Sequence, residues 1–430
     1  MTVRIIPESL SADPVAVDRF NRSVLSVSLS DEVGQVAEVL VQVGLWDEVN
    51  GGWREDLVEA LYPGESAEVW DGKECHGSFT FETQERNYSQ DETTFTAWGY
   101  GGLRALVKEE QSRVYQGYTN DSDWIPLLLD EHGMGVDLKS SEFQSFKGDR
   151  FKELGESDLN FLNTIAMANG LGLPYVRYDP QAQKETVVLR ALDPEANRGL
   201  GALKLRVTSE TGESDFTEFG TLWDAGDMPT AVEVIGWDKA VRKPYRVTVQ
   251  ATPKGPKLLS KEYTDIGRAE RKKVAPGRRG GDSRGVVVHL LGDGREAVDT
   301  NVVYRVKTGK RRRRIRAKKQ YREILATTFA EGVDDAVKFA KRWLQTRMEA
   351  YYTCDGVLVP NLPGTEGFRV NQAHRVVGAA QDDNGWYIVT SVNHEWGADG
   401  HAVTFDGSRL LLDVIAPLRG QISKRLSKSA

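Results

Sequence analysis

The sequence has 430 residues, of which 40% are hydrophobic and 28% charged, and this composition is typical of a folded protein with two to four domains. It has no apolar run of the roughly 18 residues that a membrane span requires and no signal-peptide core at its start, so we expect synthesis and folding in a cytoplasm without membrane insertion. The net charge of −7 gives no sign of general nucleic-acid affinity, and the distant cysteines Cys75 and Cys354, which form no CxxC pair, argue against a disulfide scaffold or structural zinc site.

Alternation of apolar and polar residues predicts that residues 1–109 form a β domain. In segment 23–46, valines and leucines occupy every second position on either side of a polar turn. The same alternation returns in segments 77–87 and 93–102. Short runs of period two separated by turn residues are typical of an antiparallel sheet or barrel.

Residues 110–180 have a helical periodicity, which predicts a helix-containing α/β module. After residue 119, Ser122 or Asp123 can cap a helix that tolerates Pro126 in its first turn and ends at Gly133. A second helix follows, with Gly170 as its left-handed end. Its apolar stripe consists of Leu159, Phe161, Leu162, Ile165 and Ala166.

The start of that second helix carries Glu156, Ser157 and Asp158, for which three functions can be considered: paired catalytic acids, a phosphate-binding helix start, or a helix cap. Side chains of adjacent residues do not converge on one substrate atom. A Ser157 cap, with Asp158 at the positive end of the helix dipole, accounts for both residues. We therefore predict a structural role.

The second half of the chain contains more strands and one long helix. Residues 181–227 are predicted to be connecting strands, and 228–252 together with 346–420 a second β domain. Between them, 253–345 is predicted to be a basic Gly/Pro-rich loop followed by a helix near 333–351, and 421–430 a tail. The helix has Val337, Ala340, Leu344 and Met348 on one face, the segment 284–292 resembles a strand, and Asn384-Gly385 between alternating runs predicts a hairpin.

The sequence contains no recognisable catalytic, cofactor-binding or metal-binding pattern. His374, His394 and His401, with Glu395, lie in the last β segments, but their spacing matches no known ligand motif, and we expect surface histidines instead of a metal site. The glycines of segment 99–106 do not complete a dinucleotide-binding fingerprint, and no nucleophile elbow occurs. We expect no enzyme, no cofactor and no metal.

The segment 307–319 carries nine positive charges and no negative charge, so the rest of the chain is more acidic than the net charge suggests. Three functions remain open for it. It can bind nucleic acid by neutralising phosphates, although it contains no aromatic residue to stack on bases and only Tyr304 and Tyr321 flank it. It can instead be a solvated loop or strand edge. The third possibility is that it docks on an acidic partner protein. The partner-binding candidates are Lys310, Arg311, Arg312, Arg313, Arg314 and Arg316.

The order of these parts resembles the hub proteins of contractile injection machines, namely the late control protein D family of phage tails and the hub part of type VI secretion spikes. The resemblance rests on short motifs in a fixed order over residues 150–410. They are Glu156, Ser157, Asp158, Phe161 and Leu162; Gly236, Trp237 and Asp238; Pro363 and Gly364; and Gly385, Tyr387, Val389 and Val392 before His394.

The resemblance implies a mainly β fold with an α+β insert, in which two tail-tube-like β-barrels are joined by a helix-bearing module. It also implies a homotrimer in the virion tail baseplate that adapts a six-fold tail tube to a three-fold central spike. The implied partners are the tail tube protein, the spike protein, baseplate wedge proteins and the tape-measure protein, with DNA as a further occupant of the channel. The basic segment 253–320 has no counterpart in that family, and we expect the cell-puncturing tip to be another polypeptide.

Two other functions are compatible with the sequence. The first is a β-rich module that binds nucleic acid or carbohydrate through segment 307–319. The second is an enzyme such as a cell-wall hydrolase. Salt-dependent DNA binding would indicate the former, and release of peptidoglycan fragments the latter.

Overall fold

The computed structural model describes most of the chain in segments. The described residues are 3–47, 52–88, 93–108, 112–143, 145, 150–152, 155–192, 198–199, 202–205, 213–223, 231–238, 241–251, 256–263, 287–290, 296–299, 303–308, 311–316, 320–326, 332–349, 352–379 and 383–409. All structural statements below concern these residues. The predicted tail, 421–430, lies outside them.

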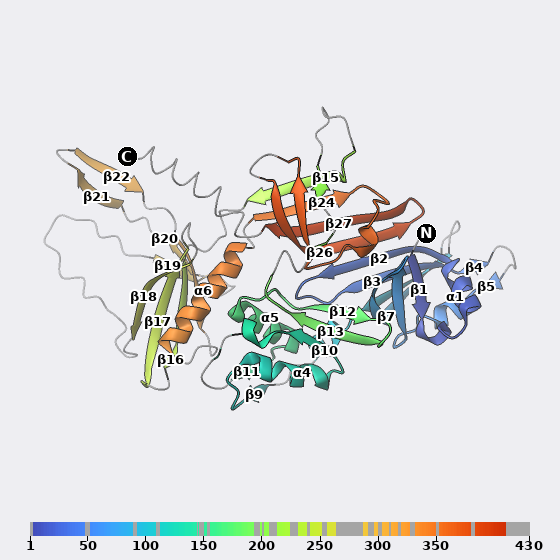
Figure 1. Ribbon diagram of the computed structural model, residues 1–430, viewed down its shortest axis with the longest axis horizontal. Helices are drawn as coiled ribbons and strands as arrows, with labels where there is room; N and C mark the ends of the chain where they lie inside the picture. Colours follow the sequence, from blue (N-terminus) through green and yellow to red (C-terminus); the bar gives the residue numbers. More distant parts are fainter. Residues whose placement is uncertain are drawn as a thin grey trace.

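Twelve strands form one principal sheet, which contains two β regions side by side (Figure 1). The first β region has the order β1 (Val3–Pro7), β6 (Ser66–Asp71), β7 (Glu74–Tyr88), β8 (Thr93–Tyr100), β3 (Glu38–Gly44) and β2 (Val24–Glu32). The second β region continues from β2 through β26 (Gly385–Gly397), β27 (Gly400–Arg409), β24 (Tyr352–Leu358) and β15 (Phe216–Trp223), while β25 (Ala373–Val377) and β14 (Leu203–Lys204) branch from β26.

The two β regions share a hydrogen-bonded ladder and part of a core. β2 and β26 pair antiparallel over six residues, from Val27 opposite Trp396 to Glu32 opposite Ser391. Trp396 packs into the apolar core of the first β region, although it belongs to a strand of the second. Short helices, including α1 (Pro14–Asn21) and α2 (Glu55–Glu59), lie at the end of the first region. The two regions are therefore joined directly as well as through the chain between them.

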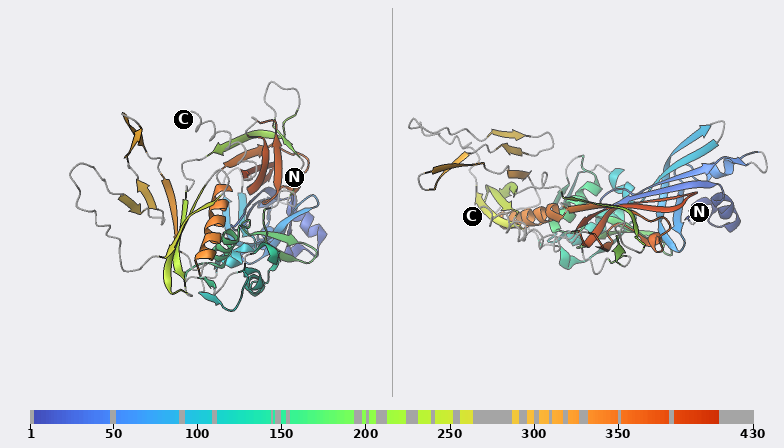
Figure 2. Two further views of the ribbon diagram at one scale, coloured as in Figure 1. Left: turned by 60° about the vertical axis from the view of Figure 1, so that its left-hand side comes forward. Right: turned by 90° about the horizontal axis from the view of Figure 1, so that it is seen from above.

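The helix-containing module lies between the two β regions in sequence and against both in space (Figures 1 and 2). It combines helices with a small mixed sheet, and its core is formed around Trp124, Phe161 and Ile165. Its elements are α3 (Leu103–Lys108), β9 (Arg113–Tyr115), η2 (Asp121–Asp123), α4 (Ile125–Glu131), β10 (Gly135–Leu138), η3 (Ser140–Glu142), β11 (Arg150–Lys152), α5 (Asp158–Asn169), β12 (Tyr175–Asp179) and β13 (Lys184–Leu189).

The sequence predicted the start and end of α5 correctly, but it predicted the wrong capping residue for the helical turns before it. Helix α5 begins after Ser157, whose Oγ accepts the N–H of Asn160 at 3.2 Å, and ends at Gly170 with a φ of 69°. Both predictions are confirmed. At the preceding helical turns, however, Asn120 provides the cap by accepting the N–H of Ser122, and α4 has no side-chain cap. Because a 3-10 turn precedes α4, the capping residue lies before Ser122 and Asp123.

A separate sheet of six strands forms a third body. It has the order β18 (Lys257–Tyr263), β17 (Lys243–Gln250), β16 (Ala231–Asp238), β23 (Gln320–Ala326), β20 (Glu296–Asp299) and β19 (Val287–Leu290). The helix α6 (Val333–Glu349) packs across it and buries Ala336, Ala340 and Leu344 against valines of β16 and β17. The hairpin β21 (Val303–Thr308) and β22 (Arg311–Arg316) forms a sheet of its own.

This third body corrects the predicted grouping of 228–252 with 346–420. Strands β16 and β17 pair with each other and with β23 or β18, and none of the described residues in them pairs with β24 to β27. The physical reason is α6, whose apolar face requires a sheet to cover it, and the neighbouring β16 and β17 supply that sheet. Likewise 253–345 is not only loop and helix, because β18 to β23 lie within it; the strand predicted in 284–292 is confirmed as β19.

The mainly β class with an α/β insert is confirmed. The predicted hairpin around Asn384-Gly385 exists, since β25 pairs antiparallel with β26. Its connection is longer than two residues, and the Asn384 side chain bonds the N–H and the carbonyl of Ala379 across it. Among the described helices, none combines the length and apolarity needed to cross a bilayer.

Candidate assembly surface and junction cavity

One face of the principal sheet carries polar side chains on eight neighbouring strands, together with apolar ones such as Leu40, Trp98 and Leu222, and we call it the polar face. Across the junction of the two β regions, Ser28 lies opposite Glu395 and Ser30 opposite Asn393, and the Ser28 hydroxyl bonds Asn393 Oδ1 at 3.2 Å. Since side chains alternate along a strand, the opposite face carries the valines and phenylalanines of the two cores. The polar face is thus continuous between the two β regions.

The polar face is acidic. Its acidic residues are Glu85, Glu38, Glu32, Glu395, Asp406, Asp355 and Glu218, which lie in β7, β3, β2, β26, β27, β24 and β15 in that order. The register of these strands brings none of their own Lys or Arg residues beside them, and Arg104 of α3 lies over the Tyr100 ring opposite Glu38, at 4.9 Å. Asp355 and Asp406 lie directly opposite each other. Burial, and then the nearby Asp355 carboxylate, raise the pKa of Asp406. Asp355 and Asp406 thus concentrate acidic groups on this part of the polar face.

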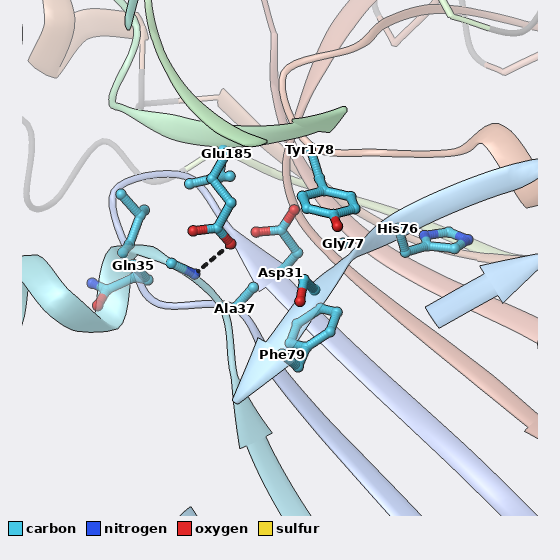
Figure 3. A pocket seen from close by; sticks show the side chains of 13 residues that line it. Asp31, Gln35, Ala37, His76, Gly77, Phe79, Tyr178 and Glu185 are labelled. Carbon is cyan, nitrogen blue, oxygen red and sulfur yellow. Dashed lines mark hydrogen bonds between the residues drawn. The ribbon is translucent and has the colours of Figure 1, made fainter. Parts of the chain in front are cut away.

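A cavity of about 300 Å³ lies where the two β regions meet the helix-containing module, and we call it the junction cavity. β2 contributes Asp31, β7 contributes His76, and the loop 368–372 contributes Arg369 and Asn371 to its wall. A narrower recess of about 30 Å³ adjoins it and shares Asp31 and His76 (Figure 3).

Three titratable side chains gather in the narrow recess. Figure 3 shows the Asp31 carboxyl between Glu185 of β13 and Tyr178 of β12, and Glu185 accepts the N–H of Gly102 at 3.1 Å. Burial raises the pKa of Asp31 to about 6, with Arg369 opposing the shift, and burial also raises the pKa of Glu185. Tyr178 donates its hydroxyl proton to Glu68 at 2.7 Å. The recess therefore holds carboxyl groups that are easily protonated.

The three histidines of the last β segments are buried, which corrects the prediction that they lie at the surface. His374, His394 and His401 are 2%, 0% and 5% exposed. His394 Nε2 lies 2.9 Å from the Phe368 carbonyl, so this nitrogen donates, and His394 Nδ1 lies 2.9 Å from His401 Nε2. Alternation on β25, β26 and β27 places His374, His394 and His401 on the core face, because the sheet is covered there.

The histidine cluster is organised for packing and hydrogen bonding. Trp396 stacks on His394 and His401, with ring centroids 5.2 and 4.7 Å away, and its indole N–H donates to Asp71 at 3.0 Å. Burial lowers the pKa of His394 to about 3, and burial also lowers the pKa of His401. Within the part of the chain that the structure describes, no group of three or more His, Cys, Asp and Glu side chains could hold a metal ion. Glu395 points to the other face of its strand and bonds Asn393.

Asp158 has a role that the sequence interpretation missed. Its side chain is fully buried, with Oδ1 2.5 Å from Lys152 Nζ and Oδ2 3.0 Å from His132 Nε2. Beside it, Asp121 accepts two hydrogen bonds from Arg150, at 2.7 and 2.9 Å. These pairs tie β11 to α5 and to the turn before α4. The one sequence signal was the alternation of Arg150 and Lys152 in a short strand, because cations on the buried face of a strand require anions.

The remaining motif residues have structural roles. Glu156 is half-buried before α5, while Phe161 and Leu162 lie in the core of the helix-containing module. Pro363 is exposed, and Gly364 adopts a φ of 93° at the start of the turn η4 (Thr365–Gly367).

The Gly236-Trp237-Asp238 motif is explained by packing within the six-stranded sheet. A Cβ on Gly236 would lie 2.2 Å from Tyr245 Oη, and Asp238 accepts the Tyr263 hydroxyl at 2.9 Å, whereas Trp237 is half-exposed. The motif therefore holds the Tyr245 and Tyr263 rings against β16.

The structure places part of the basic segment in a hairpin. Arg311 to Arg314 and Arg316 form β22, which pairs with β21 from Thr308 opposite Arg311 to Val303 opposite Arg316. Figure 1 shows this hairpin at one end of the molecule, away from the principal sheet. Lys310 lies outside the described residues.

No family model matches the chain, and neither does any curated protein. Two solved structures share its fold over nearly the whole length. The tail protein from Neisseria meningitidis MC58 has 11% sequence identity and a TM-score of 0.59, covering 95% of this chain and 96% of that chain. The 43 kDa tail protein of prophage MuSo2 from Shewanella oneidensis has 9% identity and a TM-score of 0.52, covering 91% and 95%. The fold is thus that of these phage-type tail proteins.

Proposed function

We propose that this protein is the structural hub of a phage tail or related contractile injection baseplate, where it adapts a six-fold tail tube to a three-fold central spike. The fold shared with two tail proteins over more than nine-tenths of the chain supports a tail component. The hub assignment goes further and rests on the arrangement of the two β regions. In this role the protein acts by geometry and not by catalysis.

The observation that carries the proposal is the continuous polar face across β2 and β26. One chain contributes two β regions with the same orientation toward that face. Three chains around an axis then present six β regions to a tube above. The same ring consists of only three chains, so it presents three-fold symmetry to a spike below. A closed ring also leaves no unsatisfied heterologous contact. A homotrimer therefore resolves the symmetry mismatch with a single polypeptide.

The acidic character of the polar face fits the wall of a channel. Glu38, Glu395 and Asp355 lie on it at different strands, so negative charge extends across both β regions. A negative wall repels nucleic-acid phosphates and prevents DNA from binding during passage. A tape-measure protein or DNA is the proposed occupant, and the tail tube protein and spike protein are the proposed neighbours at the two ends.

The arginine hairpin is the proposed contact for an acidic neighbour, such as a baseplate wedge protein. Arg311 to Arg314 and Arg316 lie in a hairpin separate from the other sheets. Cations in a row on a two-stranded ribbon attract an acidic surface at long range.

The proposal is tested by the mass and symmetry of the assembled protein. The full chain, expressed alone and together with the neighbouring tail genes, is measured by light scattering and imaged by electron microscopy. A ring of three chains around an open channel is expected. A dimer or tetramer inside an assembled particle would overturn the hub assignment, and clearing of a peptidoglycan gel by the pure protein would overturn the non-catalytic role.

A further inference from the structure

The junction cavity offers hydrogen-bonding groups that the protein itself does not use. Asn371 is 5% exposed, lines the cavity, and makes no side-chain hydrogen bond within the described residues. His76 Nε2 is buried at the same wall and, in the part of the chain that the structure describes, has no partner. Leaving a buried polar atom unsatisfied costs about 1–3 kcal/mol. The unsatisfied His76 Nε2, together with the side-chain amide of Asn371 at the same cavity, favours an additional hydrogen-bonding partner there.

Two guanidinium groups line the same cavity with spare donors. Arg369 uses Nη2 to bond the Cys75 carbonyl at 2.7 Å and approaches Glu74 at 3.3 Å. Its remaining N–H groups have no acceptor among the described residues. Arg198 lies over the Trp386 ring at 5.4 Å and makes no ion pair within the described chain. Guanidinium forks bind carboxylate and phosphate oxygens through paired hydrogen bonds.

The backbone and the cavity volume agree with a bound molecule. Asn371 adopts a φ of 62°, a left-handed conformation that is uncommon for residues other than glycine and that occurs often at ligand sites. A volume of about 300 Å³ is many times the roughly 10–15 Å³ that a single water needs, so the cavity has room for a small organic anion. Phe79 and Phe368 provide apolar walls.

We propose that the junction cavity binds a small oxyanion, a carboxylate or a sulfate- or phosphate-type group, through Arg198, Arg369 and Asn371. The cavity is lined by both β regions and by the helix-containing module, so the bound anion would lie where the three parts meet. This inference does not depend on the hub assignment, since it concerns the folded chain alone.

Asp31 makes the binding dependent on pH. The charged or titratable groups around it are Glu32 on its own strand, His76 on β7, Tyr178 and Glu185 on the module, His394 on β26, and Arg177 and Arg369 at the cavity wall. An anion beside Asp31 favours the protonated acid, so binding takes up a proton. Because the pKa of Asp31 is already about 6 without ligand, affinity should rise as the pH falls from 8 to 5.

The experiment titrates the full chain with sodium sulfate and, separately, with sodium acetate by calorimetry at constant ionic strength and pH 6. Sulfate serves for the pH series because its charge stays constant there. We expect one site per chain and an affinity for sulfate about tenfold higher at pH 5 than at pH 8, equivalent to a rise of about one unit in the pKa of Asp31. Preference for sulfate or acetate identifies which oxyanion class the site takes.

Three variants separate binding from folding. Arg198→Gln should weaken binding at least about tenfold, the loss of one charge-assisted contact, whereas Arg375→Gln, at an exposed arginine of β25, should leave it unchanged. Asp31→Asn mimics the protonated acid and should tighten binding at pH 8 and abolish the pH dependence. Absence of sulfate and acetate binding at pH 6, equal affinity in Arg198→Gln, or a pH dependence that persists in Asp31→Asn would each overturn the proposal.

Discussion

At the scale of single residues, the start of α5 illustrates two kinds of stabilisation that lie one position apart. Ser157 acts locally, because its hydroxyl satisfies an N–H of the first helical turn. Asp158 acts over a distance, because it joins α5 to Lys152 on β11 and to His132 after α4. The first contribution is small and replaceable, whereas the second involves buried charges that depend on each other.

Replacing Ser157 with alanine removes the cap. We expect the free energy of unfolding to fall by about 1 kcal/mol, with the helix and the assembly of the protein retained. Asn160→Ala, at an exposed position of the same helix turn, is the control and should change stability less. The measurement is urea unfolding followed by circular dichroism. An unchanged unfolding midpoint together with failed assembly would contradict the cap and would mean that Ser157 contacts a neighbouring molecule.

Replacing Lys152 with methionine leaves His132 Nε2, 3.0 Å away, in contact with the buried Asp158 carboxylate. Because breaking a buried pair leaves an uncompensated charge, we expect a loss of about 3 kcal/mol in the free energy of unfolding. The double variant Lys152→Met with Asp158→Leu should recover much of that loss. A double-mutant cycle gives the coupling, and a double variant less stable than both single variants would contradict the paired role.

At the scale of elements, the sequence predicted the bounds of a helix from neighbouring residues, but it did not predict which distant strands pair. Ser157 and Gly170 bounded α5 correctly because a cap and a left-handed end depend on neighbouring residues only. Strand β16 was recognised, but its partner β23 lies about ninety residues later, and alternation carries no information about which strands pair. The junction cavity was not predicted for the same reason, since Asp31, Arg198 and Asn371 come from distant segments.

The histidine cluster on β26 and β27 should make the folded protein sensitive to acid. The folded pKa of His394 is about 3, below the unfolded value of about 6.5, so the unfolded chain takes up a proton as the pH falls below 6.5 while the folded chain does not. The stability that this histidine contributes is therefore complete above pH 6.5 and declines by about 1.4 kcal/mol per pH unit toward pH 3.

The measurement compares unfolding free energies of the wild type and His394→Gln between pH 7 and pH 4. The variant loses ring stacking and should be less stable at pH 7, but its stability should fall less steeply with acidification. The difference in slope isolates His394 from the carboxyl groups, including Asp31, whose raised pKa acts in the opposite direction. Equal slopes would mean that His394 is not held neutral.

At the scale of the whole molecule, charge is separated along the longest dimension of the chain. The polar face of the principal sheet is acidic, and the hairpin β21–β22, with five arginines in β22, lies at one end (Figure 1). Because the arginines and the acidic face lie apart, each is available to attract an oppositely charged surface of another molecule. The hairpin can therefore be altered without disturbing the principal sheet.

Replacing Arg311, Arg312, Arg313 and Arg314 with serine should leave the fold intact and weaken attachment to an acidic neighbour in the particle. The reason is that the hairpin pairs with no strand outside itself among the described residues. Retained melting temperature combined with reduced incorporation into particles is the expected result, measured by calorimetry and by pull-down from a co-expression lysate. A lysine replacement of the same four residues is the charge-matched control, and unfolding of the isolated serine variant would contradict the prediction.

Among the described strands, the principal sheet ends at β1 and at β15, and its branch ends at β14. At β1 the N–H and the carbonyl of Ile5 are bonded by the Asn21 side chain of α1, at 2.7 Å each, whereas β15 presents backbone groups that can accept another strand. The freshly folded protein therefore faces a kinetic competition between ordered assembly and indiscriminate aggregation, decided by which partner arrives first. Slow synthesis alongside the other components of its particle should favour the ordered product, and rapid synthesis of this chain alone the aggregate.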